Sequence, residues 1–237
     1  MSAGKTNNGA TEIRLNGASL TADPSGALVW PDRRTLVVAD LHLEKGSAFA
    51  ARGQLLPPYD TRATLARLEA LIAKQRPERV ICLGDSFHDG EAGGRLAAGD
   101  RARLRRLTAA CDWVWIEGNH DPEPPEDLGG RTLGELVDGP LAFRHQARKG
   151  RGNSPGVAGE ISGHWHPKAA VHLPPKRISA PCFVSDGRRL VLPAFGAYTG
   201  GLNVLDPAVS GLFKPDFVVH LMHRERLYGF PRDSLVA

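Results

Sequence analysis

The segment Thr35-Leu36-Val37-Val38-Ala39-Asp40-Leu41-His42 decides the fold class, because a β-branched run leads directly into two metal-type ligands. The run predicts a buried strand that carries Asp40 at its tip. The same pattern, an apolar run followed by polar residues, recurs at residues 79–85 and 113–120. We therefore expect three strands whose carboxyl ends bring polar side chains to one edge of a sheet.

Two stretches with helical spacing lie between these strands. Residues 60–76 repeat leucine at helical intervals, with Asp60 as the expected N-cap and Pro77 as the stop. Residues 95–110 form the second stretch, with leucines facing inward and arginines mostly outward. Strands that alternate with helices predict a parallel α/β sheet.

The chain changes character from Leu141 onward. Its segments become short and β-like, separated by glycine and proline, which predicts a second, mainly antiparallel sheet. Residues 149–159 are rich in glycine, serine and proline and predict a surface loop. We expect residues 11–237 to form a single domain of two packed sheets with helices outside, after a disordered lead-in at residues 1–10.

Composition places the chain among ordinary globular proteins, with 41% hydrophobic and 24% charged residues and a net charge of +4. No apolar stretch reaches the length of a membrane span, and the N-terminus lacks the apolar core of a secretory signal. Cys82, Cys111 and Cys182 are expected to be free thiols in a reducing cytoplasm, with structural zinc or disulfides as alternatives. The predicted location is therefore cytoplasmic.

Seven metal-type ligands occur in five short clusters along the chain, and all are oxygen or imidazole donors: Asp40, His42, Asp85, Asn119, His145, His164 and His166. Donors without sulfur suit Mn, Fe or Zn rather than a cysteine-type structural zinc. Two cations roughly 3.5–4 Å apart can bind the phosphoryl oxygens and lower the pKa of an attacking water. The pattern therefore predicts a two-metal phosphoesterase centre, with Asp85 as the bridging carboxylate.

A phosphoester also needs a proton for its leaving alkoxide. His120 is the predicted donor, and the neighbouring carboxylate of Asp121 is expected to orient its imidazole.

The order Asp-x-His, Gly-Asp-x-x-His, Gly-Asn-His-Asp, a single His and Gly-His-x-His spans residues 35–170 and resembles the calcineurin-like metallophosphoesterase superfamily. The resemblance implies a four-layer α/β/β/α sandwich with two divalent metal ions. It also implies two ligand sets and a catalytic histidine, His120. The sets are Asp40, His42, Asp85 and His166 for one metal, and Asp85, Asn119, His145 and His164 for the other.

Three segments indicate which group within this superfamily the chain resembles most. Residues 84–90 lack the Gly-Asp-x-Val-Asp-Arg-Gly of the phosphoprotein phosphatases and are similar to the Gly-Asp-x-Phe-His of the double-strand-break repair nucleases. Residues 40–46 and 192–201 resemble more closely the bacterial ligase-associated DNA-damage-response phosphoesterases. That group implies manganese dependence and action on DNA. For His88 we expect support of a metal ligand from the second shell, with direct substrate contact as the alternative.

The predicted function is a metal-dependent DNA endonuclease acting on single-stranded or flapped DNA in repair. Mn²⁺ is the favoured cofactor, with Fe or Zn also compatible. A repair ligase, helicase or exonuclease is a possible partner, no membrane is involved, and monomer and homodimer both remain open. The alternatives are an esterase for a small nucleotide or other phosphoester, a non-catalytic scaffold, and a DNA-repair binding partner with largely structural metals.

For several residues near these clusters, the sequence fits either substrate contact or a purely structural role. Basic runs at 101–106, 144–151 and 176–177 fit either a track for backbone phosphates or ordinary solvated faces. Glu44 and Lys45 lie either near substrate or at a solvated helix start. For Trp165 we favour packing beside the site over stacking on a base.

Overall fold

The computed structural model describes residues 9–54, 56–121, 123–148 and 158–237. The predicted loop at 149–159 lies outside these residues except for its last two positions. The predicted disordered lead-in also lies outside them except for Gly9 and Ala10. The Gly9 carbonyl accepts a hydrogen bond from the Leu227 amide at 3.0 Å, so the fold begins slightly before residue 11.

The first sheet contains seven strands in sequential order: β1 (Thr11–Leu15), β2 (Ala18–Ala22), β3 (Leu28–Trp30), β4 (Thr35–Val38), β5 (Arg79–Leu83), β6 (Asp112–Ile116) and β7 (Arg131–Leu133). Strands β4 to β7 are parallel, as predicted for the three central strands. Strands β1 to β4 are antiparallel, and β1 to β3 were not predicted. Their sequence signal is Asn16-Gly17, both with positive φ, which forms a two-residue hairpin turn.

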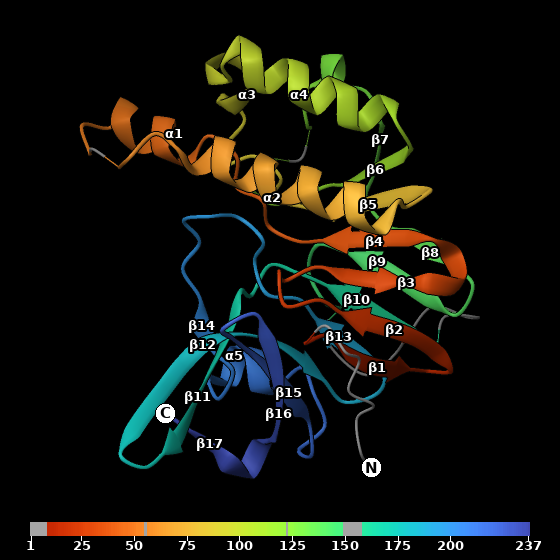
Figure 1. Ribbon diagram of the computed structural model, residues 1–237, viewed down its shortest axis with the longest axis vertical. Helices are drawn as coiled ribbons and strands as arrows, with labels where there is room; N and C mark the ends of the chain where they lie inside the picture. Colours follow the sequence, from red (N-terminus) through yellow and green to blue (C-terminus); the bar gives the residue numbers. More distant parts are fainter. Residues whose placement is uncertain (1–8, 55, 122, 149–157) are drawn as a thin grey trace.

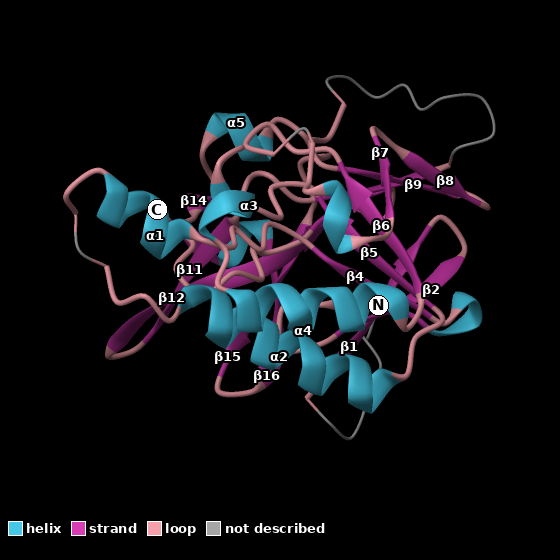
Figure 2. Ribbon diagram, turned by 90° about the horizontal axis from the view of Figure 1, so that it is seen from above, coloured by secondary structure: helices cyan, strands magenta, loops and turns pink. Residues whose placement is uncertain are grey.

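Four helices in the described chain accompany this sheet: α1 (Lys45–Ala51), α2 (Asp60–Gln75), α3 (Ala92–Arg95) and α4 (Ala98–Ala109). Helix α1 extends beyond the ends of the strands in Figure 1, whereas α2 and α4 form a layer on the sheet and lie side by side in Figure 2. The leucines of α2 and α4 pack on the sheet through a buried cluster that includes Leu65, Leu68 and Leu104. This layer lies above the strands whose ends carry the predicted ligands.

Two details of the predicted helices are wrong. The N-cap of α2 is Tyr59, and Asp60 is the first helical residue, with its carboxylate accepting a hydrogen bond from the Gly46 amide at 3.0 Å. The second predicted helix, residues 95–110, begins only at Ala98 as α4, because Arg95 ends the short α3 and Leu96 has extended backbone angles. The pair Gly93-Gly94 weakens the helix just before this break, since glycine has low helix propensity.

The second sheet contains ten strands among the described residues: β8 (Leu136–Asp138), β9 (Leu141–Arg144), β10 (Gly159–Ser162), β11 (Pro167–Leu173), β12 (Lys176–Ser185), β13 (Arg189–Val191), β14 (Leu202–Asn203), β15 (Val218–His223), β16 (Arg226–Pro231) and β17 (Leu235–Val236). Most pairs are antiparallel, as predicted. The exceptions are β9–β10–β13 and β11–β14, which are parallel. The parallel pair β9–β10 brings the segments that follow both strands to the same edge.

The two sheets pack face to face through an apolar core. Val37 and Ile81 from the first sheet and Phe143 and Ile161 from the second belong to this core and are almost fully buried. The outer face of the second sheet is covered by the short helix α5 (Pro207–Ser210) and its neighbouring residues, Phe213 among them. The predicted sandwich of two packed mixed sheets is confirmed, with its fourth layer reduced to α5. Three 3-10 turns complete the elements, at Pro31–Arg33, Glu126–Leu128 and Arg232–Ser234.

Two predictions from composition can be compared with the structure. Cys82, Cys111 and Cys182 are free thiols, with Cys82 and Cys182 buried. In the described parts of the chain, every helix is too short or too polar to cross a membrane. The single-domain organisation stays a prediction.

The segment after β13 crosses the ends of the first sheet. The Phe195 amide donates to the Ala39 carbonyl at 2.8 Å, and the Gly196 amide donates to the Asp40 carbonyl at 3.1 Å. A Cβ atom on Gly196 would lie 2.2 Å from the Leu41 carbonyl oxygen. Only glycine therefore allows this segment to approach the loop that carries Asp40.

We expect Gly196→Ala to lower the free energy of unfolding by about 1–3 kcal/mol, because the new methyl group meets rigid backbone. Gly200→Ala is the matched control in the same segment, since a Cβ there meets no atom within 4 Å. It should change stability by no more than about 0.5 kcal/mol. Urea denaturation of both variants measures this, and equal stability would contradict the close approach.

Candidate metal centre

The loops after β4 and β5 run side by side because the two strands are parallel neighbours. The His42 amide donates to the Asp85 carbonyl at 2.9 Å, and the Leu43 amide donates to the Ser86 carbonyl at 2.9 Å. Asp40 and Asp85 are at most 2% exposed. The strand pairing thus continues beyond both strands and places two buried carboxylates at one edge.

Most of the predicted ligands have a left-handed backbone. Eleven non-glycine residues in the described chain have positive φ, and five of them are predicted ligands: Asp40, His42, Asp85, His164 and His166. Such conformations cost on the order of 1–3 kcal/mol each and gather at functional sites. The alternation at Asp40, Leu41 and His42 points both polar side chains to the centre while Leu41 packs in the core beneath the helices.

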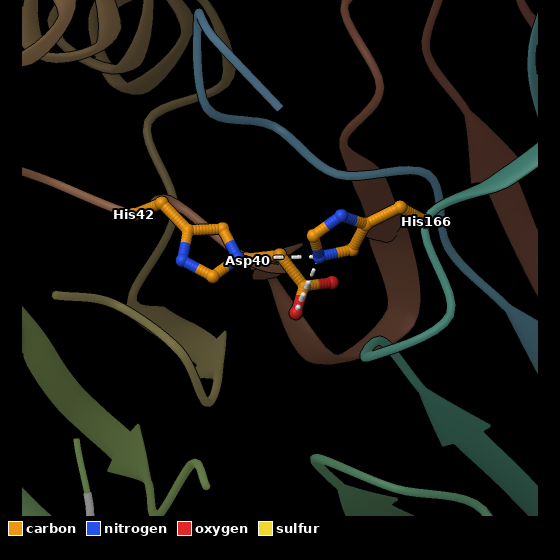
Figure 3. Close-up of side chains that lie close together, drawn as sticks. All are labelled: Asp40, His42 and His166. Atoms are coloured by element: carbon orange, nitrogen blue, oxygen red, sulfur yellow. Dashed lines mark hydrogen bonds and ion pairs between the residues drawn. The ribbon is translucent and has the colours of Figure 1, made fainter. Parts of the chain in front are cut away.

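The first cluster consists of Asp40, His42 and His166 (Figure 3). The Nε2 atoms of His42 and His166 are 3.2 Å apart, and the two rings point toward each other. His166 Nε2 is also 3.4 Å from Asp40 Oδ1. Residues more than 120 positions apart in the sequence thus present their donor atoms to one small volume.

The second cluster consists of Asp85, His145 and His164, with Asn119 beside it. His145 Nδ1 donates to the Leu83 carbonyl at 2.9 Å, which leaves Nε2 facing the cluster. Three atoms that can bind a metal surround His145 Nε2: Asn119 Oδ1 at 2.9 Å, His164 Nδ1 at 3.0 Å and Asp85 Oδ1 at 3.4 Å. The least specific sequence signal, the single His145, therefore occupies the middle of this cluster.

The carboxylate of Asp85 lies between the two clusters. Its Oδ1 faces His145 Nε2, and its Oδ2 is 3.9 Å from His42 Nε2. One oxygen atom is therefore directed toward each cluster. This is the placement that a bridging carboxylate requires.

The donor atoms of both clusters fit divalent cations. Two nitrogens bound to one cation at the ~2.1 Å metal–imidazole distance lie about 3.0–3.4 Å apart, and the observed His–His separations are 3.2 and 3.0 Å. Burial, followed by the charges of His166 and His120, lowers the pKa of His42 to about 2. Burial and then the charge of His145 also lower the pKa of His164. Neutral imidazoles with facing lone pairs are ready to bind a metal.

His120 lies at the open side of the clusters. Its amide donates to Asp85 Oδ1 at 2.9 Å, and its ring Nδ1 lies 3.0 Å from the His88 carbonyl oxygen. Because a carbonyl only accepts, Nδ1 carries the proton of the neutral ring. The Nε2 atom then faces the centre, 4.0 Å from Asp85 Oδ2, and the side chain is 43% exposed.

The predicted role of Asp121 in orienting His120 is wrong. Its carboxylate is 2% exposed and accepts a hydrogen bond from the Phe87 amide at 2.9 Å. Burial raises the pKa of Asp121 to about 8. The group that orients His120 is the His88 carbonyl, which no side-chain pattern in the sequence could have indicated.

His88 and Trp165 both lie next to the clusters. The His88 ring stacks on His120 with 5.6 Å between ring centres and lies 5.7 Å from the His42 ring. Trp165 packs on the apolar cluster of the second sheet and meets the His164 ring edge-on at 4.9 Å. Trp165 therefore packs beside the site, as predicted.

Most of the described arginines in the first two runs of the predicted phosphate track are paired with acidic residues. In residues 101–106, Arg103 pairs with Glu69 at 2.7 Å, while Arg101 and Arg105 both pair with Asp127. Arg144 is 5% exposed and paired with Glu160 and Glu135. Acidic residues distant in sequence thus occupy these cations. Residues 149–151 of the second run lie outside the described chain.

This chain is similar to known proteins in sequence or in structure. A family model for the calcineurin-like phosphoesterases matches residues 33–168. The crystal structure of Pseudomonas putida nuclease MPE is 31% identical, covers 93% of this chain and 100% of its own, and has a TM-score of 0.70. Yfce, a phosphoesterase from E. coli, is 14% identical, covers 83% of this chain and 97% of its own, and has a TM-score of 0.41. Comparison with curated proteins gave no significant match.

The position of Asp121 predicts a structural effect. Asp121→Ala should lower the free energy of unfolding by about 1–3 kcal/mol, because the buried Phe87 amide loses its acceptor. Asp121→Asn keeps an acceptor oxygen and should lose less stability while it retains phosphodiester turnover. Denaturation and turnover of both variants distinguish the roles. A stable Asp121→Asn protein with strongly reduced turnover would restore the orienting role.

Proposed function

This chain belongs to the calcineurin-like phosphoesterase family, and we propose that this metal-dependent phosphoesterase is a DNA endonuclease. The observation that carries phosphodiester hydrolysis is the pair of donor clusters with the Asp85 carboxylate between them. The choice of a nucleic acid is supported by the 31% identity, over 93% of this chain, to a nuclease.

We assign one cation to Asp40, His42, Asp85 and His166, and a second to Asp85, Asn119, His145 and His164. The contacts within 4 Å described above support this division, with Asp85 in both sets. When bound, the two cations neutralise phosphoryl oxygens and activate the attacking water. Mn²⁺ is our proposed ion because carboxylate and amide oxygens make up part of each set, and Fe or Zn fit the imidazoles.

His120 is the proposed proton donor to the leaving oxygen. The His88 carbonyl holds Nδ1–H, so Nε2 is the atom that faces substrate, and in the imidazolium form it carries a transferable proton. The stacked ring of His88 limits the rotation of His120. His88 therefore supports catalysis in our proposal through the position of His120.

The cellular role that we propose is repair of single-stranded or flapped DNA in the cytoplasm, as in the ligase-associated group that residues 40–46 and 192–201 resemble. A repair ligase, helicase or exonuclease would be the partner. Incubation of the protein with linear and circular single-stranded DNA under a panel of metals tests the endonuclease assignment. Cleavage of the circle is expected, and turnover of small phosphodiesters alone would contradict it.

Asp85→Asn should reduce turnover of a small phosphodiester by more than about 100-fold. This loss is larger than is usual when a residue that only supports a metal ligand is changed. It should also lower the bound metal content, because both proposed sites lose the same ligand charge. Asp89→Asn is the matched control: it removes an equal charge four residues later, where the carboxylate pairs with Arg95. Metal analysis and turnover check both variants, and normal metal content in Asp85→Asn would contradict the shared ligand.

His120→Ala should retain metal yet lose DNA cleavage by about 10²–10⁴-fold, because the alkoxide leaving group depends on a proton donor. A nitrophenolate leaves without that help, so turnover of bis-p-nitrophenyl phosphate should fall clearly less. Loss of metal would make His120 a ligand. Equal losses for both substrates with metal retained would make it a phosphate-positioning residue.

A further inference from the structure

Helix α1 directs one face toward the histidines at the edge of the metal centre. Lys45 and Phe49 lie at positions i and i+4 of α1, and Arg52, the C-cap residue seven positions after Lys45, continues the same side. The Phe49 ring is 5.8 Å from the His88 ring, which in turn stacks on His120. Lys45 Nζ lies 5.9 Å from the centre of the Phe49 ring. The face thus continues outward from the proposed proton donor.

The two cations of this face differ from the arginines of the basic runs. Within the described chain, neither Lys45 nor Arg52 forms an ion pair. Lys45 is only partly exposed and Arg52 is exposed. Asp60, the acidic group whose charge acts on Lys45, accepts a hydrogen bond from the Gly46 amide.

The acidic and basic side chains at the start of α1 point in different directions. The neighbouring Glu44 is turned the other way, since its carboxylate accepts a hydrogen bond from the Thr61 hydroxyl at 2.9 Å. The helix therefore offers two positive charges to the entrance and keeps its negative charge away from it.

We propose that Lys45 and Arg52 bind backbone phosphates of the DNA strand next to the scissile phosphate. This inference rests on the proposed function. Seven residues separate the two cations, which corresponds to about 10 Å along the helix. A single small phosphodiester does not span that distance, whereas successive phosphates of a strand do. The α1 face therefore selects a polymer over a small ester.

Binding of a fluorescent oligothymidylate tests the proposal in the full-length, metal-loaded His120→Ala protein, in which cleavage of bound DNA should be at least about 100-fold slower. Lys45→Gln and Arg52→Gln should each weaken binding roughly fivefold at 0.1 M salt and reduce the slope of log Kd against log salt by about 0.7. The double variant should reduce it by about 1.4. In the otherwise wild-type protein, kcat/KM should fall more for DNA than for bis-p-nitrophenyl phosphate.

Arg106→Gln is the matched control. Arg106 is exposed, forms no ion pair in the described chain, and lies near the C-terminal end of α4, at the opposite edge of the sheet. Arg106→Gln should leave the affinity for the oligothymidylate and the slope of log Kd against log salt unchanged. Lys45→Arg and Arg52→Lys should keep the slope, and thermal unfolding verifies that every variant is folded.

Three results would overturn the proposal in distinguishable ways. In the first, the wild-type protein binds and cuts DNA while the glutamine variants keep its affinity and its salt dependence. In that case the α1 face is not the phosphate site. If Lys45→Gln reduces turnover of both substrates equally with unchanged affinity, Lys45 acts at the scissile phosphate itself. If the wild-type protein neither binds nor cuts DNA, both the proposed function and this inference are wrong.

Discussion

The buried carboxylate of Asp85 couples the loops that form the centre. Its Oδ1 accepts the His120 amide at 2.9 Å and faces His145, and its Oδ2 faces His42 and His120. Its own carbonyl accepts the His42 amide. Three other chain segments, those of His42, His120 and His145, therefore meet one side chain at the end of β5, and their positions cannot change independently. A buried carboxylate surrounded by imidazoles is stable only with compensating positive charge, which is the reason the site suits cations.

Rigidity around this carboxylate is obtained at the cost of local strain. Five predicted ligands have a left-handed backbone, and Gly84 has φ of 72° where a Cβ would lie 2.6 Å from the His145 ring. The parallel strands β4 and β5 and the parallel pair β9–β10 hold both sides of the centre. The apolar core between the sheets stabilises this arrangement, since it fixes the strands whose ends carry the ligands.

The arginine-rich segments of this protein are not the segments in which we propose substrate contact. Arg101, Arg103 and Arg105 are paired with acidic residues, and Arg144 is buried in an ion-pair network. Among the residues that the structure describes, Lys45 and Arg52 are the cations beside the centre that form no ion pair. Charge density along a sequence therefore indicates solvated or paired faces as readily as a binding surface.

The sequence by itself determined the family, the parallel strands β4 to β6 and the order of the seven ligand types, because strand tips and donor chemistry are local properties. The hairpin at Asn16-Gly17 was also readable in principle. Only the tertiary structure decided that the His88 carbonyl orients His120 and that Asp121 supports Phe87. Those facts depend on backbone groups and on residues brought together by packing, and neither is encoded in the spacing of residues along the chain.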